Sequence, residues 1–152
     1  MQVLVLVDVQ NPYVLNKDAG YVKHVVDLIH DAKARGYFIC VLKQSGPVHQ
    51  TRKEIMEALE GYSLCGHATK NIWNGSRWVK RMLQEKGINA SRFVLAGAFS
   101  EECVLDTMQG LRYYFGGTPM AACTPACLNR RGAFDWTPHA RILNFKCIEK
   151  FA

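Results

Sequence analysis

The sequence predicts an α/β protein, a three-layer αβα sandwich with a mostly parallel, Rossmann-like central sheet. Two observations carry this prediction. Continuous apolar runs, typical of strands buried on both faces, alternate along the chain with stretches that are apolar on one helical face only. In addition, no repeat, linker or low-complexity tract interrupts the 152 residues, so we expect a single domain, residues 1–152. This alternation favours an open parallel sheet with helices on both faces.

Three apolar runs predict the central strands, at residues 3–7, 37–42 and 93–98. Residues 118–123 predict another strand, and residues 147–149 a short strand at one edge. The segment 44–68 is the least regular part of the chain and contains one weak helical pattern, at residues 54–59. We therefore expect the strands to lie mainly outside this segment.

Helices are predicted between these strands from apolar residues that recur at helical spacing. A first face consists of Val22, Val25, Val26 and Ile29; a second of Trp78, Val79, Met82 and Leu83; a third of Val104, Leu105, Met108 and Leu111. Gly36 and Gly87 provide stop signals after the first and second helices. Thr137 followed by Pro138 predicts the cap and first residue of a short last helix.

Composition argues against several functional classes. The net charge is +6, but Lys and Arg are scattered and only Arg130 and Arg131 adjoin, so we expect a solvated basic surface and no nucleic-acid partner. The opening apolar run is too short for a signal peptide or a membrane span. Six cysteines without a secretory signal indicate reduced thiols and a cytoplasmic location.

Candidate functional residues follow the ends of the predicted strands, where ligands bind in open parallel sheets. Asp8 and Gln10 follow the first strand, and the turn 100–103 follows the strand at 93–98. Each residue also has a structural interpretation: Asp8 as a turn residue, Cys103 as a small buried filler, and Lys70 as a solvated surface lysine. The occurrence of Asp8, Lys70 and Cys103 together, in this order along the chain, favours a functional site over these separate structural roles.

That combination resembles the isochorismatase-like cysteine hydrolases, a superfamily that includes nicotinamidases and N-carbamoylsarcosine amidases. LVLVDVQNPY is similar to the Asp-x-Gln opening of the family, with Tyr13 where a Phe is usual. HATKNIWNGSRWVKRML is similar to the lysine segment, and VLAGAFSEECVLDTMQGLRYYFG resembles the nucleophile segment. The resemblance extends over nearly the whole chain.

The resemblance implies a catalytic triad of Asp8, Lys70 and Cys103, with Asp8 as the general base and Cys103 as the nucleophile. It also implies a non-proline cis peptide between Ala98 and Phe99. The backbone amides of Phe99 and Cys103 would then form an oxyanion hole.

We expect pocket specificity to come from Gln10, Tyr13, Trp73, Phe99 and the middle segment 44–68, and the aromatic residues suit a small, flat, uncharged ring or amide. The family also suggests self-association, so we expect a homo-oligomer that acts on a small molecule.

The charge of the Cys103 thiol depends on its neighbours. Ser100 is a good helix cap, which would make Cys103 the third helical residue, where the helix dipole lowers the pKa of a thiol. Glu101 and Glu102 would raise this pKa if they pointed inward, and the Lys70 ammonium would offset them.

Metal binding is not expected. The segment that corresponds to the Asp-x-His metal motif of nicotinamidases reads VLKQSGPVHQTRK, with no acidic residue near His49. Cys65 and His67 offer two ligands, but no second close pair completes a tetrahedral set. We therefore expect neither a metal nor another cofactor.

Three functions remain open. The first is a metal-independent cysteine hydrolase that cleaves a small amide or related C–N bond through a thioester on Cys103. The second is a non-catalytic relative that serves small-molecule binding or assembly, which the adjacent Glu101 and Glu102 and the short segment 44–68 favour. The third is a flavodoxin-like or nucleotide-binding module, although the turn after the first strand lacks the glycines that such modules use.

Overall fold

The computed structural model describes residues 1–11, 13–47 and 49–152 and contains one six-stranded sheet. The strand order is β3-β2-β1-β4-β5-β6, and every neighbouring pair is parallel. The strands are β1 (Gln2–Val7), β2 (Phe38–Gln44), β3 (Cys65–Lys70), β4 (Arg92–Ala98), β5 (Met120–Leu128) and β6 (Lys146–Ile148). The predicted α/β class with a parallel central sheet is confirmed.

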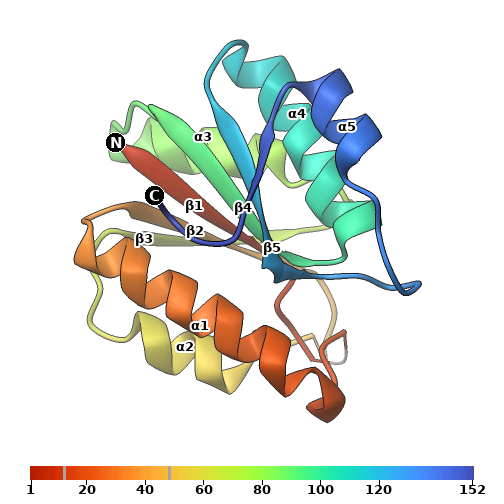
Figure 1. Ribbon diagram of the computed structural model, residues 1–152. Coiled ribbons are helices and arrows are strands. Elements are labelled where there is room, and N and C mark those ends of the chain that lie inside the picture. The colour runs from red at the N-terminus through yellow and green to blue at the C-terminus, as the bar shows by residue number, and fades with distance from the viewer. Residues whose placement is uncertain (12, 48) are drawn as a thin grey trace.

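Helices cover both faces of this sheet (Figure 1). One face is covered by α1 (Ala19–Ala34), which follows the short 3-10 helix η1 (Asn16–Asp18), and by α2 (Lys53–Leu59). The other face is covered by α3 (Ser76–Lys86), α4 (Leu105–Phe115) and α5 (Thr137–Leu143). The result is the expected three-layer arrangement.

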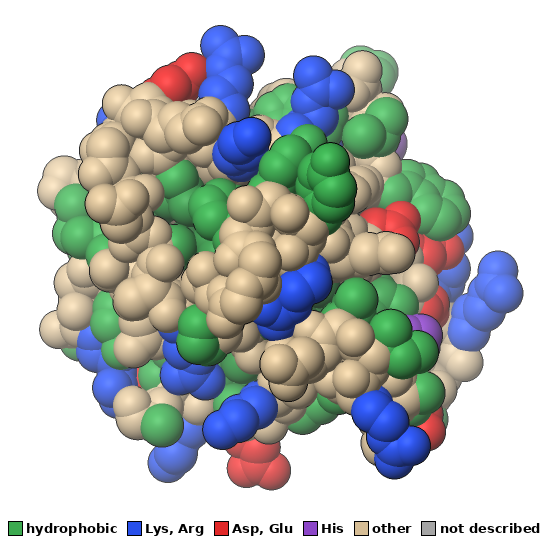
Figure 2. Space-filling model, turned by 90° about the horizontal axis from the view of Figure 1, so that it is seen from above, with side chains coloured by type: hydrophobic (Ala, Val, Ile, Leu, Met, Phe, Trp, Pro, Cys, Tyr) green, Lys and Arg blue, Asp and Glu red, His purple; other side chains and the backbone are tan. Residues whose placement is uncertain are grey.

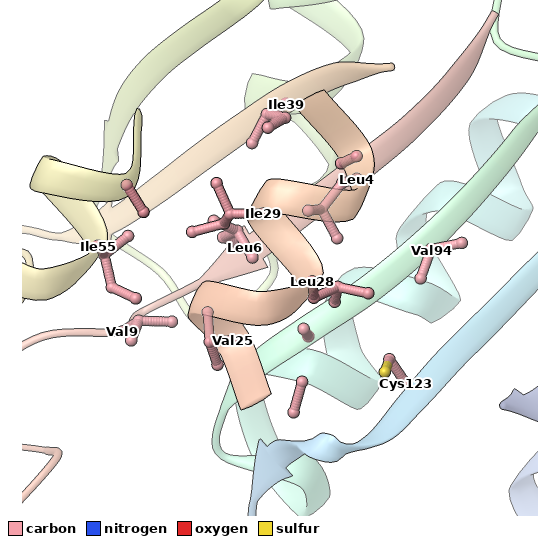
Figure 3. Packing of buried hydrophobic residues seen from close by; sticks show 14 of the residues in the cluster. Leu4, Leu6, Val9, Val25, Leu28, Ile29, Ile39, Ile55, Val94 and Cys123 are labelled. Atoms are coloured by element: carbon pink, nitrogen blue, oxygen red, sulfur yellow. The ribbon is translucent and has the colours of Figure 1, made fainter. Parts of the chain in front are cut away.

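The continuous apolar runs of the central strands have a direct explanation. Successive strand residues point to opposite faces of a sheet, and here each face is packed against helices. Leu4 and Leu6 of β1 pack against Val25 and Ile29 of α1, as Figure 3 shows. Val5, between the two leucines in sequence, belongs to the cluster on the opposite face.

The main error of the sequence-based prediction is β3. The segment 44–68 was expected to be irregular beyond one weak helix, yet its end forms a strand that pairs with β2 from Ile39↔Cys65 to Gln44↔Lys70. This strand lies at the edge of the sheet and alternates in burial, so it needs few apolar residues and lacks a continuous apolar run. The weak helix is confirmed as α2.

Two further boundaries differ from prediction. Strand β5 continues to Leu128, past Pro125, through a shift in register opposite Leu95 and Gly97. Helix α5 already includes Thr137, whose N–H donates to Asp135 Oδ1 at 2.9 Å, so Thr137 is not the cap.

Surface charge is dispersed on the face that carries α3, α4 and α5. Figure 2 shows Lys and Arg side chains separated from one another by hydrophobic and uncharged groups on this side of the molecule. Among the helices in the part of the chain that the structure describes, none is long and apolar enough to cross a membrane.

Candidate active site

Asp8 directly follows β1 and turns the chain at the carboxyl end of the sheet. Its φ angle is +51°, in the left-handed region that few residues other than Gly, Asn and Asp adopt readily. Its N–H donates to the Leu42 carbonyl of the neighbouring strand at 3.0 Å. The residue is thus fixed at the carboxyl end of the central strands, and only 1% of it is exposed.

Lys70 ends β3 and is completely buried, with 0% exposure. Its ammonium donates to Asp8 Oδ2 at 2.8 Å, to Gln44 Oε1 at 2.8 Å and to the Ile72 carbonyl at 3.2 Å. An ammonium has three protons, and a buried charge is tolerated only when it is paired and hydrogen-bonded. All three protons of Lys70 are therefore in use.

Cys103 lies in the π-type turn η2 (Ser100–Val104), which connects β4 to α4. The peptide bond between Ala98 and Phe99 is cis, as the resemblance implied. Gly97 has a φ of +136°, and a Cβ there would overlap the Val7 carbonyl, so this position of β4 requires glycine.

The predicted capping role of Ser100 is wrong. Its hydroxyl makes no capping bond and instead donates to Asn129 Oδ1 at 2.5 Å, with the Leu128 carbonyl oxygen 3.4 Å away. Glu102 has non-helical angles, φ −123° and ψ −107°, and the α-helix begins only at Leu105. Cys103 therefore precedes α4 and is not in its first turn.

The thiol of Cys103 is neutral in this environment. Burial and, to a smaller extent, the neighbouring Asp8 carboxylate raise its pKa to about 12, although the Lys70 ammonium opposes this shift. This direction is opposite to the one expected from a helix N-terminus.

The Asp8 carboxylate has one oxygen available for a proton. Burial also raises the pKa of Asp8, against the opposing effect of Lys70. Lys70 occupies Oδ2, whereas Oδ1 is buried and has no hydrogen-bond partner among the described residues. A proton that leaves the adjacent thiol of Cys103 can therefore be accepted at Oδ1.

A cavity of about 120 Å³ opens between these groups. It is lined by Asp8, Tyr13, Gln44, Trp73, Ala98, Phe99, Glu102, Cys103 and Arg130. Ligand pockets for drug-sized molecules have about 300 to 1,000 Å³, so this cavity suits a much smaller molecule. A larger hollow of about 630 Å³ lies along α1 and α2, but Asp8, Lys70 and Cys103 do not line it.

Three of the four predicted pocket residues line this cavity, namely Tyr13, Trp73 and Phe99. The rings of Tyr13 and Phe99 meet edge to face, with centroids 6.0 Å apart. Gln10 is fully buried and does not line the cavity. Its amide instead bonds the backbone of Gln44 and His49.

Three polar lining residues were not predicted individually: Gln44, which begins the segment 44–68 expected to contribute to the pocket, Glu102 and Arg130. Arg130 Nη2 lies 3.2 Å from Glu102 Oε2, and its guanidinium lies over the Phe99 ring at 4.6 Å. Gln44 ends β2, and Arg130 follows β5 after one residue. Because ligands bind beyond the ends of parallel strands, these positions could have identified Gln44 and Arg130 from the sequence.

The groups that could hold a metal do not come together. Within residues 1–11, 13–47 and 49–152, no three His, Cys, Asp or Glu side chains form a cluster suited to a metal ion. His49 Nδ1 lies 3.5 Å from the Tyr13 hydroxyl, and His67 Nε2 lies 3.6 Å from Cys65 Sγ. All six cysteines are free thiols.

Comparison with known proteins gives matches in structure only. No protein-family model matches the chain, and no curated protein sequence matches it. An N-carbamoylsarcosine amidase from Thermoplasma acidophilum superposes with a TM-score of 0.79 at 16% identity, covering 97% of this chain and 95% of that one.

Two further structures are similar over almost the whole chain. An isochorismatase from Pseudomonas putida KT2440 gives a TM-score of 0.74 at 19% identity, with 98% and 87% coverage. A pyrazinamidase/nicotinamidase from Streptococcus mutans UA159 gives 0.77 at 13% identity, with 97% and 100% coverage. The resemblance predicted from the sequence is thus confirmed at the level of structure: this chain has the isochorismatase-like fold.

Proposed function

We propose that this protein is a metal-independent cysteine hydrolase that cleaves a small amide or a related C–N bond through a thioester on Cys103. The observation that carries the proposal is the buried ion pair between Lys70 Nζ and Asp8 Oδ2, 2.8 Å apart, beside a thiol that lines an open cavity. A buried charge pair contributes little to stability compared with apolar packing, so its presence at a cavity favours a chemical role.

In the first half-reaction, Cys103 Sγ attacks the carbonyl carbon of the amide while Asp8 Oδ1 accepts the thiol proton. The carbonyl oxygen becomes an oxyanion, which the amides of Phe99 and Cys103 stabilise. The C–N bond then breaks, Asp8 returns the proton to the leaving nitrogen, and an amine or ammonia departs. A thioester remains on Cys103.

In the second half-reaction, water attacks the thioester carbonyl carbon and gives a proton to Asp8. The C–S bond breaks, the carboxylic acid is released, and the Cys103 sulfur recovers the proton from Asp8. Lys70 keeps Asp8 oriented through its contact with Oδ2. The resting thiol is neutral, because its pKa is raised to about 12, so the proton leaves sulfur only when Asp8 accepts it during attack.

The raised pKa of the thiol also supports a second candidate, a protein that binds a small molecule without chemical turnover. Burial and the Asp8 charge disfavour the thiolate, which is the reactive form of cysteine. Glu102 lines the same cavity and adds negative charge near the sulfur. In this case the ion pair would serve to shape a binding site.

The two candidates differ in covalent chemistry at Cys103. The experiment incubates the protein with a panel of small primary amides and with p-nitrophenyl acetate, and measures released ammonia and intact mass. If the protein is a hydrolase, peptide mass spectrometry should locate an acyl adduct on Cys103. The adduct and the release of ammonia should both be absent in Cys103→Ala. The matched control Cys147→Ala changes an exposed thiol and should retain both signals. Binding of amides without an adduct or ammonia would support the second candidate.

A further inference from the structure

A thiol and an imidazole lie in contact at the beginning of β3. Cys65 and His67 are two positions apart, so their side chains share one face of the strand, the face that α2 covers. Cys65 Sγ lies 3.6 Å from His67 Nε2. Zinc bonds of about 2.3 Å to sulfur and about 2.1 Å to nitrogen, at the tetrahedral angle, place two ligand atoms about 3.6 Å apart. The pair therefore has the separation that one tetrahedral zinc ion requires.

One chain provides only half of such a site. His67 is exposed and Cys65 is half-buried, so a metal ion can reach the pair from solvent. Burial raises the pKa of the Cys65 thiol to about 11, so zinc would displace a proton when it binds. Among the residues that the structure describes, no third His, Cys, Asp or Glu joins the two to complete a metal site. The remaining ligands must come from outside this chain.

The outer edge of β3 is open to another strand. Among the described strands, β3 pairs with β2 alone. The carbonyls of Leu64 and Lys70 accept hydrogen bonds from the β2 side. Backbone groups alternate in direction along a strand, so those of Cys65, His67 and Thr69 face outward. Before Lys70 the strand contains no Lys, Arg, Asp, Glu or Pro, and its register with β2 has no shift, so it lacks the usual features that protect an edge from pairing.

A second copy of the chain offers the same edge and the same two ligands. Identical edges that pair about a two-fold axis run antiparallel. In the register centred on Gly66, Cys65 of one copy lies opposite His67 of the other, and the outward backbone groups of these residues exchange hydrogen bonds. Residues opposite each other share a face, with Cβ atoms about 4.5 to 5.5 Å apart. Two thiols and two imidazoles thus meet on one face of the joined sheets.

We propose that Cys65 and His67 form half of a zinc site, which a second copy of this chain completes along the open edge of β3. The metal is held by two sulfur and two nitrogen ligands, a set that zinc prefers in structural sites. Each thiol loses its proton to solvent when the metal binds. The metal joins the two sheets, and neither copy holds it alone.

The opposite face of the edge is compatible with this arrangement. Gly66 has no side chain, and Met82 of α3 occupies the space where its Cβ would lie. The exposed Arg81 and Glu85 of the same helix line a hollow of about 210 Å³ beside β3. A two-fold axis reverses the direction of α3 in the second copy, so the basic end of this pair in one copy approaches the acidic end in the other. The contact is therefore complementary in charge.

The zinc site is separate from the catalytic cavity. Cys65 begins β3 and Lys70 ends it, so the two residues lie about 16 Å apart along the strand. Neither Cys65 nor His67 lines the cavity that contains Cys103. The metal has a structural role, and the inference does not depend on the proposed function.

The test measures metal binding and molar mass together. The full chain is freed of metal with EDTA, kept reduced, and titrated with Zn²⁺ or with Co²⁺, whose absorption spectrum reports its ligands. We expect one metal ion for every two chains and, with Co²⁺, a thiolate-to-cobalt charge-transfer band together with the visible bands of tetrahedral cobalt. Light scattering should show that Zn²⁺ doubles the molar mass relative to the protein in EDTA.

Two ligand variants and two matched controls identify the site. Cys65→Ser and His67→Ala should each weaken cobalt binding by more than about 100-fold, beyond the effect of losing an outer-shell partner, and should abolish the doubling. Cys147→Ser and His30→Ala change an exposed thiol and an exposed imidazole elsewhere and should behave as the wild type. Circular dichroism and thermal unfolding in EDTA establish that each variant is folded.

The shared site is supported if this stoichiometry and the doubling are both lost in the two ligand variants and kept in the two controls. It is refuted if the protein binds no zinc, if it binds one ion per chain, or if the molar mass is the same with and without zinc. Doubling that persists in Cys65→Ser or His67→Ala would also refute it, because the second copy would then be held by other contacts.

Discussion

Lys70 Nζ and Asp8 Oδ2 lie 2.8 Å apart in a completely buried ion pair, although 62 positions separate the two residues in the sequence. Strand β3 delivers the lysine and the turn after β1 the aspartate, and β2 lies between these strands. The pair therefore couples the stability of the sheet to the chemistry of the cavity.

Removal of the lysine should be strongly destabilising. In Lys70→Met the buried Asp8 carboxylate loses its partner, and we expect the free energy of unfolding to fall by about 3 to 5 kcal/mol in urea denaturation. The double variant with Asp8→Asn should lose less than the sum of the single losses, by about 1 to 3 kcal/mol. Lys53→Met, which breaks an exposed pair with Glu57, is the control and should change stability by less than about 0.5 kcal/mol. Additive losses would refute the coupling.

The pKa of Cys103 predicts slow modification at neutral pH. The ordinary thiol value is 9.0 and this one is raised to about 12, so the reactive thiolate is scarce at pH 7 and increases about tenfold per pH unit up to that value. With methyl methanethiosulfonate and peptide mass spectrometry, we expect the exposed Cys147 to react first at pH 7. If Cys103 reacted faster than Cys147 at pH 7, the result would contradict the raised pKa and support the lowered pKa that the sequence predicts.

Asp8→Asn should separate thiol reactivity from turnover. The substitution removes a negative charge that raises the Cys103 pKa, so the pH profile of thiol modification should shift to lower pH. Hydrolysis of any amide found to be a substrate should be lost, because the carboxylate proposed to accept the thiol proton is replaced by an amide. Retained hydrolysis would exclude Asp8 as the base, and an unchanged profile would contradict its contact with the thiol.

Gly97→Ala should destabilise the fold beside the cis peptide. The residue has a φ of +136°, and an added Cβ would overlap the Val7 carbonyl of β1. We expect a loss of at least about 1 to 3 kcal/mol in chemical denaturation. Gly117→Ala is the matched control, because a Cβ there meets no atom within 4 Å. If the two variants were equally stable, β1 and β4 would be able to move apart at Gly97 without a loss in the free energy of unfolding.

Ser100 and Asn129 should be energetically coupled. The Ser100 hydroxyl donates to Asn129 Oδ1 at 2.5 Å, which joins the turn of Cys103 to the loop after β5. A double-mutant cycle with Ser100→Ala and Asn129→Ala should give an interaction energy of about 0.5 to 1.5 kcal/mol. If Ser100 acted as a helix cap instead, its substitution would be costly whether or not Asn129 is present.

The central strands could be predicted because burial on both faces leaves a continuous apolar run. Residues 3–7, 37–42 and 93–98 lie in or adjoin β1, β2 and β4, each within two residues of the observed ends. Strand β3 escaped prediction because an edge strand needs little apolar surface, and its sequence CGHATK contains a glycine and three polar residues.

The polar lining of the cavity was predicted only in part. Arg130 follows the end of β5, and the rule that ligands bind beyond strand ends would have included it if that strand had been extended to Leu128. Pro125 hid the extension, because proline is normally excluded from paired strands. The contact between Gln44 and Lys70 could not be predicted, because 26 positions separate the two residues and such a pair leaves no local pattern.

The strand order has a consequence for synthesis of the chain. β1 is flanked by β2 and by β4, so during synthesis one edge of β1 stays bare until residue 98 emerges from the ribosome. The partners Asp8 and Lys70 both lie within residues 1–70, whereas Cys103 follows β4. A chain interrupted before β4 would therefore carry an exposed, aggregation-prone strand edge but no nucleophile, and the thiol would meet its base only in a chain in which β4 is available to cover that edge of β1.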